Sequence, residues 1–185
     1  DGGLTWSNVV TNVAAAAGTW LWDSTPFTSS IRGVWRVESE SEAGAADSTD
    51  LPFALRNQPL YFYVNDNSIA GDVYCKTAGS VTNNGVTPGT PNNSLQYVLN
   101  TYDLEPADVV YVDTANFTTT APLTFTQFDI GDSTNRVTVQ GSTNDAAGGT
   151  VITKFGGGTL FDINQRQGIQ LRNLNLRAGG SVVSC

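Results

Sequence analysis

Charged side chains that could do chemistry are few in this 185-residue chain. Nine Lys and Arg and 17 Asp and Glu give a net charge of −8, and there is no His. A Ser-His-Asp triad, a Cys-His dyad and His-ligated zinc are therefore excluded within the chain. Eight charged residues are candidates for outward-facing positions on or beside strands: Asp113, Asp129, Asp132, Asp145, Asp162, Lys154, Arg166 and Arg172.

These eight residues do not recur in register along the chain. Glycoside hydrolysis needs two carboxylates about 5–10 Å apart, and the spacing gives no such pair. We therefore expect no catalytic residue and no cofactor, and we favour a non-enzymatic role.

Two other features could carry chemistry. Asp66, Asn67 and Asp72 offer oxygen ligands suited to calcium, but such turns also use these oxygens for their own hydrogen bonds, so a metal site stays open. Cys75 and Cys185 could form one bridge in an oxidising compartment. Two unpaired thiols, or a partner beyond the last residue, are equally compatible with the sequence.

The composition indicates where the protein is located. Thr, Asn, Ser and Gly fill 72 of 185 positions, which is typical of exposed strands and tight turns. Together with the acidity, this predicts a secreted, extracellular protein of the cell surface. With only two Lys and seven Arg, we expect no nucleic-acid-binding surface and no membrane-binding patch. No apolar stretch is long enough for membrane insertion. Because Asp1 is not Met, we expect a processed chain or a piece of a longer one.

The first segment, residues 1–57, reads as short strands over residues 19–23, 31–37 and 53–56, with a frayed one at 4–6. Trp20, Trp22 and Trp35 lie in or near these strands, where they would pack as a core or stack on sugar rings; we favour the core.

Two runs of this segment, residues 30–40 and 47–55, resemble the closing strands of an immunoglobulin or fibronectin type III-like module of secreted surface proteins. Such a module needs about 100 residues and seven strands, so the resemblance implies a partial one. We expect its exposed edges to pack on the second domain or to pair with another subunit by strand addition.

The second segment, residues 58–185, opens with a strand at 61–64 and a helix over residues 93–102. Leu95, Val98, Leu99 and Tyr102 follow helical spacing, with Asn93 or Ser94 as N-cap. Short strand candidates follow at residues 109–112, 123–128, 136–140, 150–154, 159–163 and 168–176. Arg172-Asn173 breaks the last alternation, and Asn173 and Asn175 are either the start of an asparagine ladder or ordinary turn residues.

Several runs of this segment resemble the start of right-handed parallel β-helix proteins of the pectate-lyase-like superfamily. They are residues 63–66, 79–85, 87–91, 94–96, 104–113 and 116–117, with Asn84, Ala107 and residues 115–117 departing from the usual motif. The resemblance implies a solenoid of parallel strands whose open end the helix caps.

We therefore expect an all-β fold, a right-handed parallel β-helix (residues 58–185) with one N-terminal capping helix, preceded by a small β-sandwich-like element (residues 1–57). The expected function is a non-enzymatic, extracellular structural or adhesive segment of a bacterial surface protein or filament, with assembly head to tail or by strand addition as the expected mode. Its partners would be copies of itself or further chain at both ends, and polysaccharide. The alternatives are the non-catalytic N-terminal part of a polysaccharide lyase or hydrolase, and a carbohydrate-binding module.

Overall fold

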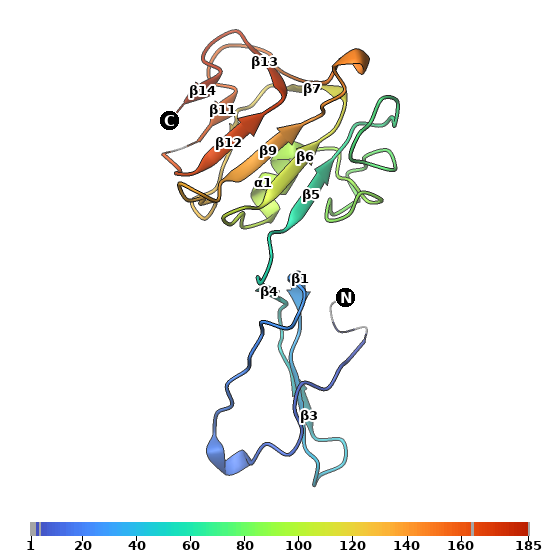
Figure 1. The fold of residues 1–185 in the computed structure, drawn as a ribbon, viewed down its shortest axis with the longest axis vertical. Coiled ribbons are helices and arrows are strands. Elements are labelled where there is room, and N and C mark those ends of the chain that lie inside the picture. Colours follow the sequence, from blue (N-terminus) through green and yellow to red (C-terminus); the bar gives the residue numbers. More distant parts are fainter. Residues whose placement is uncertain (1–2, 4, 164, 185) are drawn as a thin grey trace. The chain divides into compact units, whose positions relative to one another are not determined.

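The chain divides into two compact units, Asp1–Leu60 and Tyr61–Cys185 (Figure 1). The computed structural model describes residues 3, 5–163 and 165–184. We call the two parts the N-terminal unit and the C-terminal unit.

The N-terminal unit contains two separate antiparallel pairs of strands. Strand β1 (Ser30–Gly33) pairs with β4 (Phe53–Leu55), and β2 (Arg36–Glu38) pairs with β3 (Ala46–Ser48). A short 3₁₀ turn, η1 (Ala15–Ala17), precedes them. None of the described side chains of this unit is buried. A two-stranded sheet is marginally stable alone, so this unit has little core of its own.

Every described strand of the C-terminal unit runs parallel to its neighbours. The largest sheet has the order β12-β9-β6-β5 and contains β5 (Tyr61–Val64), β6 (Val109–Val112), β9 (Val137–Gly141) and β12 (Ile169–Arg172).

Two three-stranded sheets complete the C-terminal unit. One has the order β13-β10-β7, with β7 (Ala115–Thr119), β10 (Thr150–Lys154) and β13 (Leu174–Ala178). The other has the order β14-β11-β8, with the two-residue strands β8 (Leu123–Thr124), β11 (Phe161–Asp162) and β14 (Val183–Ser184). A second 3₁₀ turn, η2 (Asp145–Ala147), precedes β10.

The core of the C-terminal unit is built from rows of apolar residues that share a register across each sheet. In the four-stranded sheet, Phe62, Val110 and Val139 are at most 1% exposed and occupy one row. Phe125, Leu160 and Phe161 are fully buried between the strands. Burying side chains of this size gives about 2 kcal/mol each, which is the main stabilisation of this unit.

Helix α1 (Leu95–Thr101) confirms the helical spacing read from the sequence. The Ser94 side chain accepts a hydrogen bond from the Tyr97 N–H, so Ser94 is the N-cap, and Leu95, Val98 and Leu99 are buried. The Gln96 side chain binds both backbone groups of Thr124, accepting from its N–H (2.8 Å) and donating to its carbonyl (3.1 Å). The helix therefore attaches to the edge of β8.

The fold-class prediction is wrong. The described residues form five small sheets, parallel sets of four, three and three strands and two antiparallel pairs, beside a short helix. This is an α/β-like arrangement and not a clear β-helix, and the predicted β-sandwich-like element is two separate strand pairs. The physical reason is that strands of two to five residues alternate with long irregular loops, notably residues 65–94 and 125–136, which prevents a regular repeat.

The individual strands agree with the sequence better than the fold class does. The strands expected at 109–112 and 150–154 form with those bounds, and the run 168–176 breaks at Asn173, whose φ of 49° makes the turn between β12 and β13. Residues 19–23 form no strand, and residues 31–37 split into β1 and β2. Of the expected strand 4–6, Leu4 lies outside the described residues.

Candidate functional site

Among the described residues, β12, β13 and β14 each have a strand neighbour on one side only, as do β7 and β8 at the other ends of their sheets. These strands, β12, β13 and β14, end the three strand orders, and we call their unpaired sides the open edge. Unpaired N–H and C=O groups along a strand are a template for pairing with another strand. The open edge is therefore a surface that can bind by backbone hydrogen bonding.

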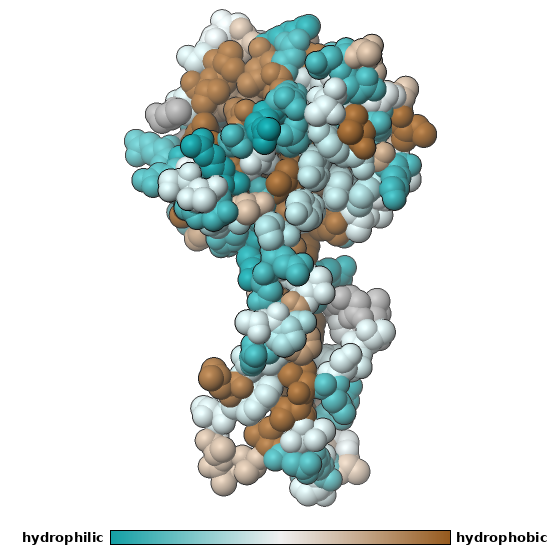
Figure 2. Space-filling view, in the orientation of Figure 1, coloured by the Kyte–Doolittle hydropathy of each residue, from teal (hydrophilic) through white to brown (hydrophobic). Residues whose placement is uncertain are grey.

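Apolar side chains beside the open edge are incompletely covered. Leu171 is half-buried, although its register neighbour Val139 is fully buried; likewise Leu176 is half-buried and its neighbour Ile152 is 2% exposed. Val183 of β14 is 37% exposed. Figure 2 shows hydrophobic residues gathered at the end of the C-terminal unit that carries β13 and β14. A second strand would gain apolar contacts as well as hydrogen bonds there.

The opposite side of the four-stranded sheet is closed by a loop. The Tyr63 N–H donates to the Gly85 carbonyl at 2.7 Å, and the Asn92 N–H donates to the Tyr63 carbonyl at 3.0 Å. Val64 also forms an isolated parallel bridge with Asn92. Strand β5 therefore has partners on both sides, and among the described residues the unpaired edge of this sheet is β12.

A second surface is a cluster of four tyrosines on the outward face of the four-stranded sheet, which we call the tyrosine row. The Tyr111 ring lies 4.4 Å from that of Tyr74, 5.5 Å from that of Tyr63 and 6.1 Å from that of Tyr61. Tyr61 is 48% exposed and the other three are half-buried. The row thus presents aromatic faces and edges to solvent.

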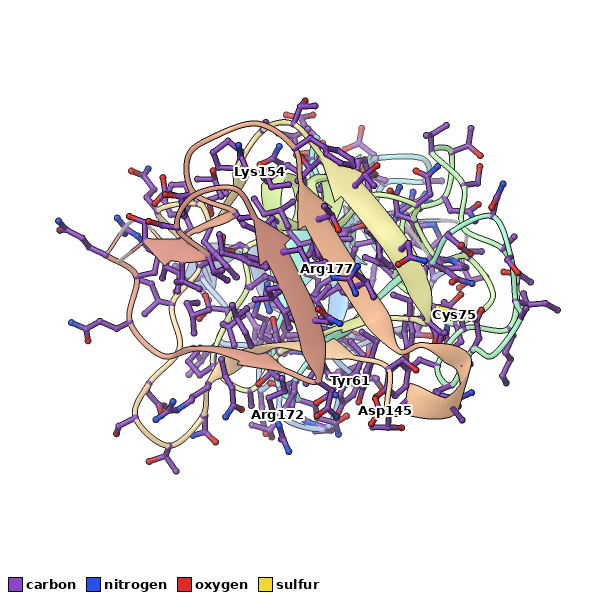
Figure 3. The ribbon with its side chains drawn as sticks, turned by 90° about the horizontal axis from the view of Figure 1, so that it is seen from above. Tyr61, Cys75, Asp145, Lys154, Arg172 and Arg177 are labelled. Atoms are coloured by element: carbon purple, nitrogen blue, oxygen red, sulfur yellow. The ribbon has the colours of Figure 1, made fainter. Side chains whose placement is uncertain are left out.

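Polar side chains continue the tyrosine row across the sheet. The strand register aligns Tyr63, Tyr111, Gln140 and Arg172, and Figure 3 shows Tyr61 and Arg172 toward the same side of the molecule. The eight outward positions of the sheet contain no acidic residue: Tyr61, Tyr63, Val109, Tyr111, Thr138, Gln140, Gln170 and Arg172. Burial raises the pKa of Tyr63 and of Tyr111, so both phenols stay neutral hydrogen-bond donors at physiological pH.

Three of the charged residues proposed from sequence as outward groups are buried instead. Asp113 is fully buried and accepts backbone hydrogen bonds from Val73, Tyr74 and Cys75. Asp129 is also fully buried and accepts from the N–H groups of Leu104 and Thr126. Lys154 is 6% exposed and donates to the Gly157 carbonyl. These side chains hold loops in place.

The other five lie apart. Asp132 and Asp145 are in exposed turns, Asp162 is half-buried in β11, Arg166 donates to the Gln127 carbonyl and Arg172 ends β12. An open polar depression beside β13 has one carboxylate, that of Asp145, among its lining residues: Thr143, Asp145, Gly148, Gly149, Thr150, Asn173, Leu174 and Asn175. The depression therefore lacks the second acid that glycoside hydrolysis uses.

The proposed calcium loop is occupied by its own hydrogen bonds. Asp66 accepts from the Ser68 N–H at 2.8 Å, and Asp72 accepts from the Asn65 side chain at 2.6 Å. One Asp72 oxygen is buried without a hydrogen-bond partner, and burial is the main cause of that residue's raised pKa. Within the described part of the chain, no group of three His, Cys, Asp or Glu is placed to hold a metal ion.

Cys75 is a buried free thiol, and burial raises its pKa well above the ordinary value. Its proposed partner, Cys185, lies outside the described residues. A buried protonated thiol is a poor nucleophile, so Cys75 packs as a small apolar side chain.

The tryptophans of the N-terminal unit pack on each other. The rings of Trp22 and Trp35 meet edge to face at 4.6 Å, and those of Trp20 and Trp35 at 6.2 Å. Trp22 and Trp35 are half-buried in this cluster, and Trp20 is 42% exposed. Edge-to-face packing gives a cluster and not the flat exposed row that would stack on sugar rings.

Compared with protein families, curated proteins and solved structures, the chain matches none of them. Nothing in these comparisons identifies the β-helix superfamily or the immunoglobulin-like family that the sequence motifs resemble. Among the described residues, none of the helices has the length and apolar character required to span a bilayer. The function must therefore be inferred from the chain's own surfaces.

Proposed function

We propose that the chain is a non-enzymatic structural or adhesive segment of an extracellular, surface-exposed assembly, and that it associates with other copies of itself through the open edge. The observation that carries this proposal is that all three parallel sheets end in a strand with one unpaired side, at β12, β13 and β14.

Two further observations support association. The apolar side chains beside the open edge are half-buried where their register neighbours are fully buried, so a partner strand would remove apolar surface from water. The N-terminal unit has no buried side chain among those described, and partner contacts would supply burial that it lacks. The acidic, Thr- and Asn-rich composition agrees with an extracellular location.

The test is the dependence of solution mass on concentration in variants of the open edge. Ala178→Pro in β13 and Val183→Pro in β14 each remove an N–H and place a ring where a partner strand would lie. Ala178→Ser and Val183→Thr are the matched controls, because they keep the N–H at the same positions.

Light scattering between 1 µM and about 1 mM should show a rising mass for the wild type and both controls, a span that covers weak to moderate interfaces. At least one proline variant should associate about tenfold more weakly, equivalent to about 1.4 kcal/mol, with an unchanged urea midpoint. A wild type that stays monomeric throughout, or proline variants that associate like the wild type, would refute the proposal.

A second candidate function, carbohydrate binding, is favoured by the tyrosine row. Aromatic rings beside Gln140 and Arg172 offer stacking and hydrogen bonding on a surface without carboxylates. Binding to a panel of neutral and uronic-acid oligosaccharides tests it. Tyr61→Ser should weaken any binding about tenfold, whereas Tyr97→Ser, on α1 and 37% exposed, should not. Absence of binding across the panel would remove this candidate.

A further inference from the structure

The open edge lies in the part of the chain with the strongest local excess of positive charge. Residues 165–184 contain three Arg and no Asp or Glu, although the whole chain has a net charge of −8. Arg172 is the last residue of β12 and Arg177 lies in β13, and both are exposed. Figure 3 shows the positions of these two arginines on their strands. A strand that adds here meets positive charge.

The β2–β3 hairpin of the N-terminal unit has the opposite character. Residues 36–55 contain one cation, Arg36, which forms an ion pair with Glu38 at 2.8 Å, against five acidic residues: Glu38, Glu40, Glu42, Asp47 and Asp50. Within residues 3 and 5–60, strands β2 and β3 pair only with each other, and all six of their residues are exposed. The hairpin therefore also has free strand edges, and its charge complements that of the open edge.

The apolar pattern of β2 also fits the open edge. Val37 is 71% exposed and points to the opposite face of the hairpin from Arg36 and Glu38, because neighbouring residues of a strand alternate. Placed beside β13 with Val37 toward the interior, β2 would extend the row of Phe117, Ile152 and Leu176. Glu38, which pairs with Arg36 at 2.8 Å within the hairpin, would then lie on the outward face, where Arg177 is exposed.

We propose that the acidic β2–β3 hairpin of one copy adds to the open edge of a second copy, so that copies join head to tail. This inference rests on the proposed function and names the partner segment for it. Such a contact uses different surfaces on its two sides and therefore propagates along a chain of copies. Backbone pairing would supply affinity, and the charges would select the hairpin over other exposed strands.

Charge-reversal variants of the full chain test the pairing. The edge variant carries Arg172→Glu and Arg177→Glu, and the hairpin variant carries Glu40→Arg and Glu42→Arg. A control variant carries Lys76→Glu and Arg136→Glu, which changes net charge as the edge variant does, at exposed positions outside β12–β14. Solution mass is measured for each variant and for a 1:1 mixture of the edge and hairpin variants.

Each of the two test variants should self-associate at least about tenfold more weakly than the wild type, whereas the control should not. The mixture should recover the wild-type mass. The acidic edge of the edge variant can then bind the basic hairpin of the hairpin variant, and the basic edge of the hairpin variant can bind the acidic hairpin of the edge variant. A hairpin variant that associates normally, or a mixture that stays dissociated, overturns the inference. If the charge variants contradict the hairpin pairing but the proline variants of the open edge still associate more weakly, the proposed function stands and only the hairpin inference fails. A wild type that is monomeric at all concentrations refutes both proposals.

Discussion

The carboxylate of Asp113 accepts a hydrogen bond from the backbone N–H of Cys75 at 2.6 Å, across 38 residues of sequence. The same carboxylate also accepts from the N–H groups of Val73, Tyr74 and Thr114 at 2.7 to 2.9 Å. Four amide donors satisfy the buried side chain of Asp113 and attach the loop before Lys76 to the end of β6. Asp113, which the sequence placed among outward charged groups, thus acts as a structural clamp.

The first prediction concerns this clamp. In Asp113→Asn one acceptor oxygen becomes an NH₂ group that faces N–H donors, leaving buried amides unpaired. We expect a loss of about 2–4 kcal/mol in the free energy of unfolding, since each unsatisfied buried donor costs about 1–3 kcal/mol. Urea unfolding measures it, and Asp145→Asn, at an exposed turn, should change little. Equal stability of the two variants would contradict the role of Asp113.

The second prediction concerns pH. Burial is the main cause of the raised pKa of Asp129, although hydrogen bonds from Leu104 and Thr126 oppose it. The folded protein therefore binds the carboxyl proton of Asp129 more tightly than the unfolded chain does. Its contribution to stability is complete below the unfolded value of 3.8 and is lost as pH rises through the folded pKa. Asp129→Asn should consequently cost less stability at pH 7 than at pH 4.

Asp132 supplies a control of opposite sign. Backbone hydrogen bonds from Asn135 and Thr134 lower its pKa, so its contribution is present above the unfolded value and is lost as pH falls. Asp132→Asn should therefore cost more at pH 7 than at pH 4. Urea unfolding of both variants at pH 4 and pH 7 measures these costs. If both substitutions cost more stability at the same pH, this reasoning is wrong.

The third prediction concerns the Cys75 thiol, which is buried and has a raised pKa. In a Cys185→Ser background, a thiol-specific reagent at pH 8 should modify Cys75 at least about 100-fold more slowly in buffer than in urea, because the reactive species is the accessible thiolate. Reaction at similar rates in both conditions would show that the loop over Cys75 opens freely.

The fourth prediction compares two register partners, Ile152 of β10 and Leu176 of the edge strand β13. Ile152→Ala should cost about 2–5 kcal/mol, because it leaves a cavity in a closed core. Leu176→Ala should cost clearly less at low micromolar concentration, since that side chain is half-buried. Urea unfolding at about 2 µM, a concentration at which weak interfaces are dissociated, measures the stability cost of both substitutions. Equal costs would indicate that the open edge is already covered.

The local elements of the C-terminal unit were predictable because their signals are short-range. Hydrophobic spacing and the Ser94 cap specify α1, and the run of residues 150–154 forms β10 with the expected bounds. Strand β7 was missed, since Phe117 is its one large apolar residue, beside Ala, Asn and Thr; its strand state comes from pairing with β10. Motif resemblance did not predict the way in which these pieces assemble into small separate sheets.

The candidate surfaces were predicted less well. The sequence drew attention to Trp20, Trp22 and Trp35, but the tyrosine row depends on a register that brings together residues from three separate segments. Likewise, nothing local distinguishes the buried Asp113 from the exposed Asp145. The charge contrast between residues 37–55 and 165–184 is readable in the sequence, but only the strand orders show that both segments have unpaired edges.

The loop that closes the side of β5 also bears on how the protein ages. Asn84-Gly85 is a dipeptide at which spontaneous deamidation is fast in open peptides, because the glycine nitrogen can attack the asparagine side chain. Here the Gly85 N–H donates to the Thr90 carbonyl at 2.9 Å, and the Asn84 side-chain oxygen accepts from Val86 and Thr90. The attacking nitrogen is held by the Thr90 carbonyl and the asparagine side chain is fixed in place, so loss of ammonia at this position would report that the loop had detached from the sheet.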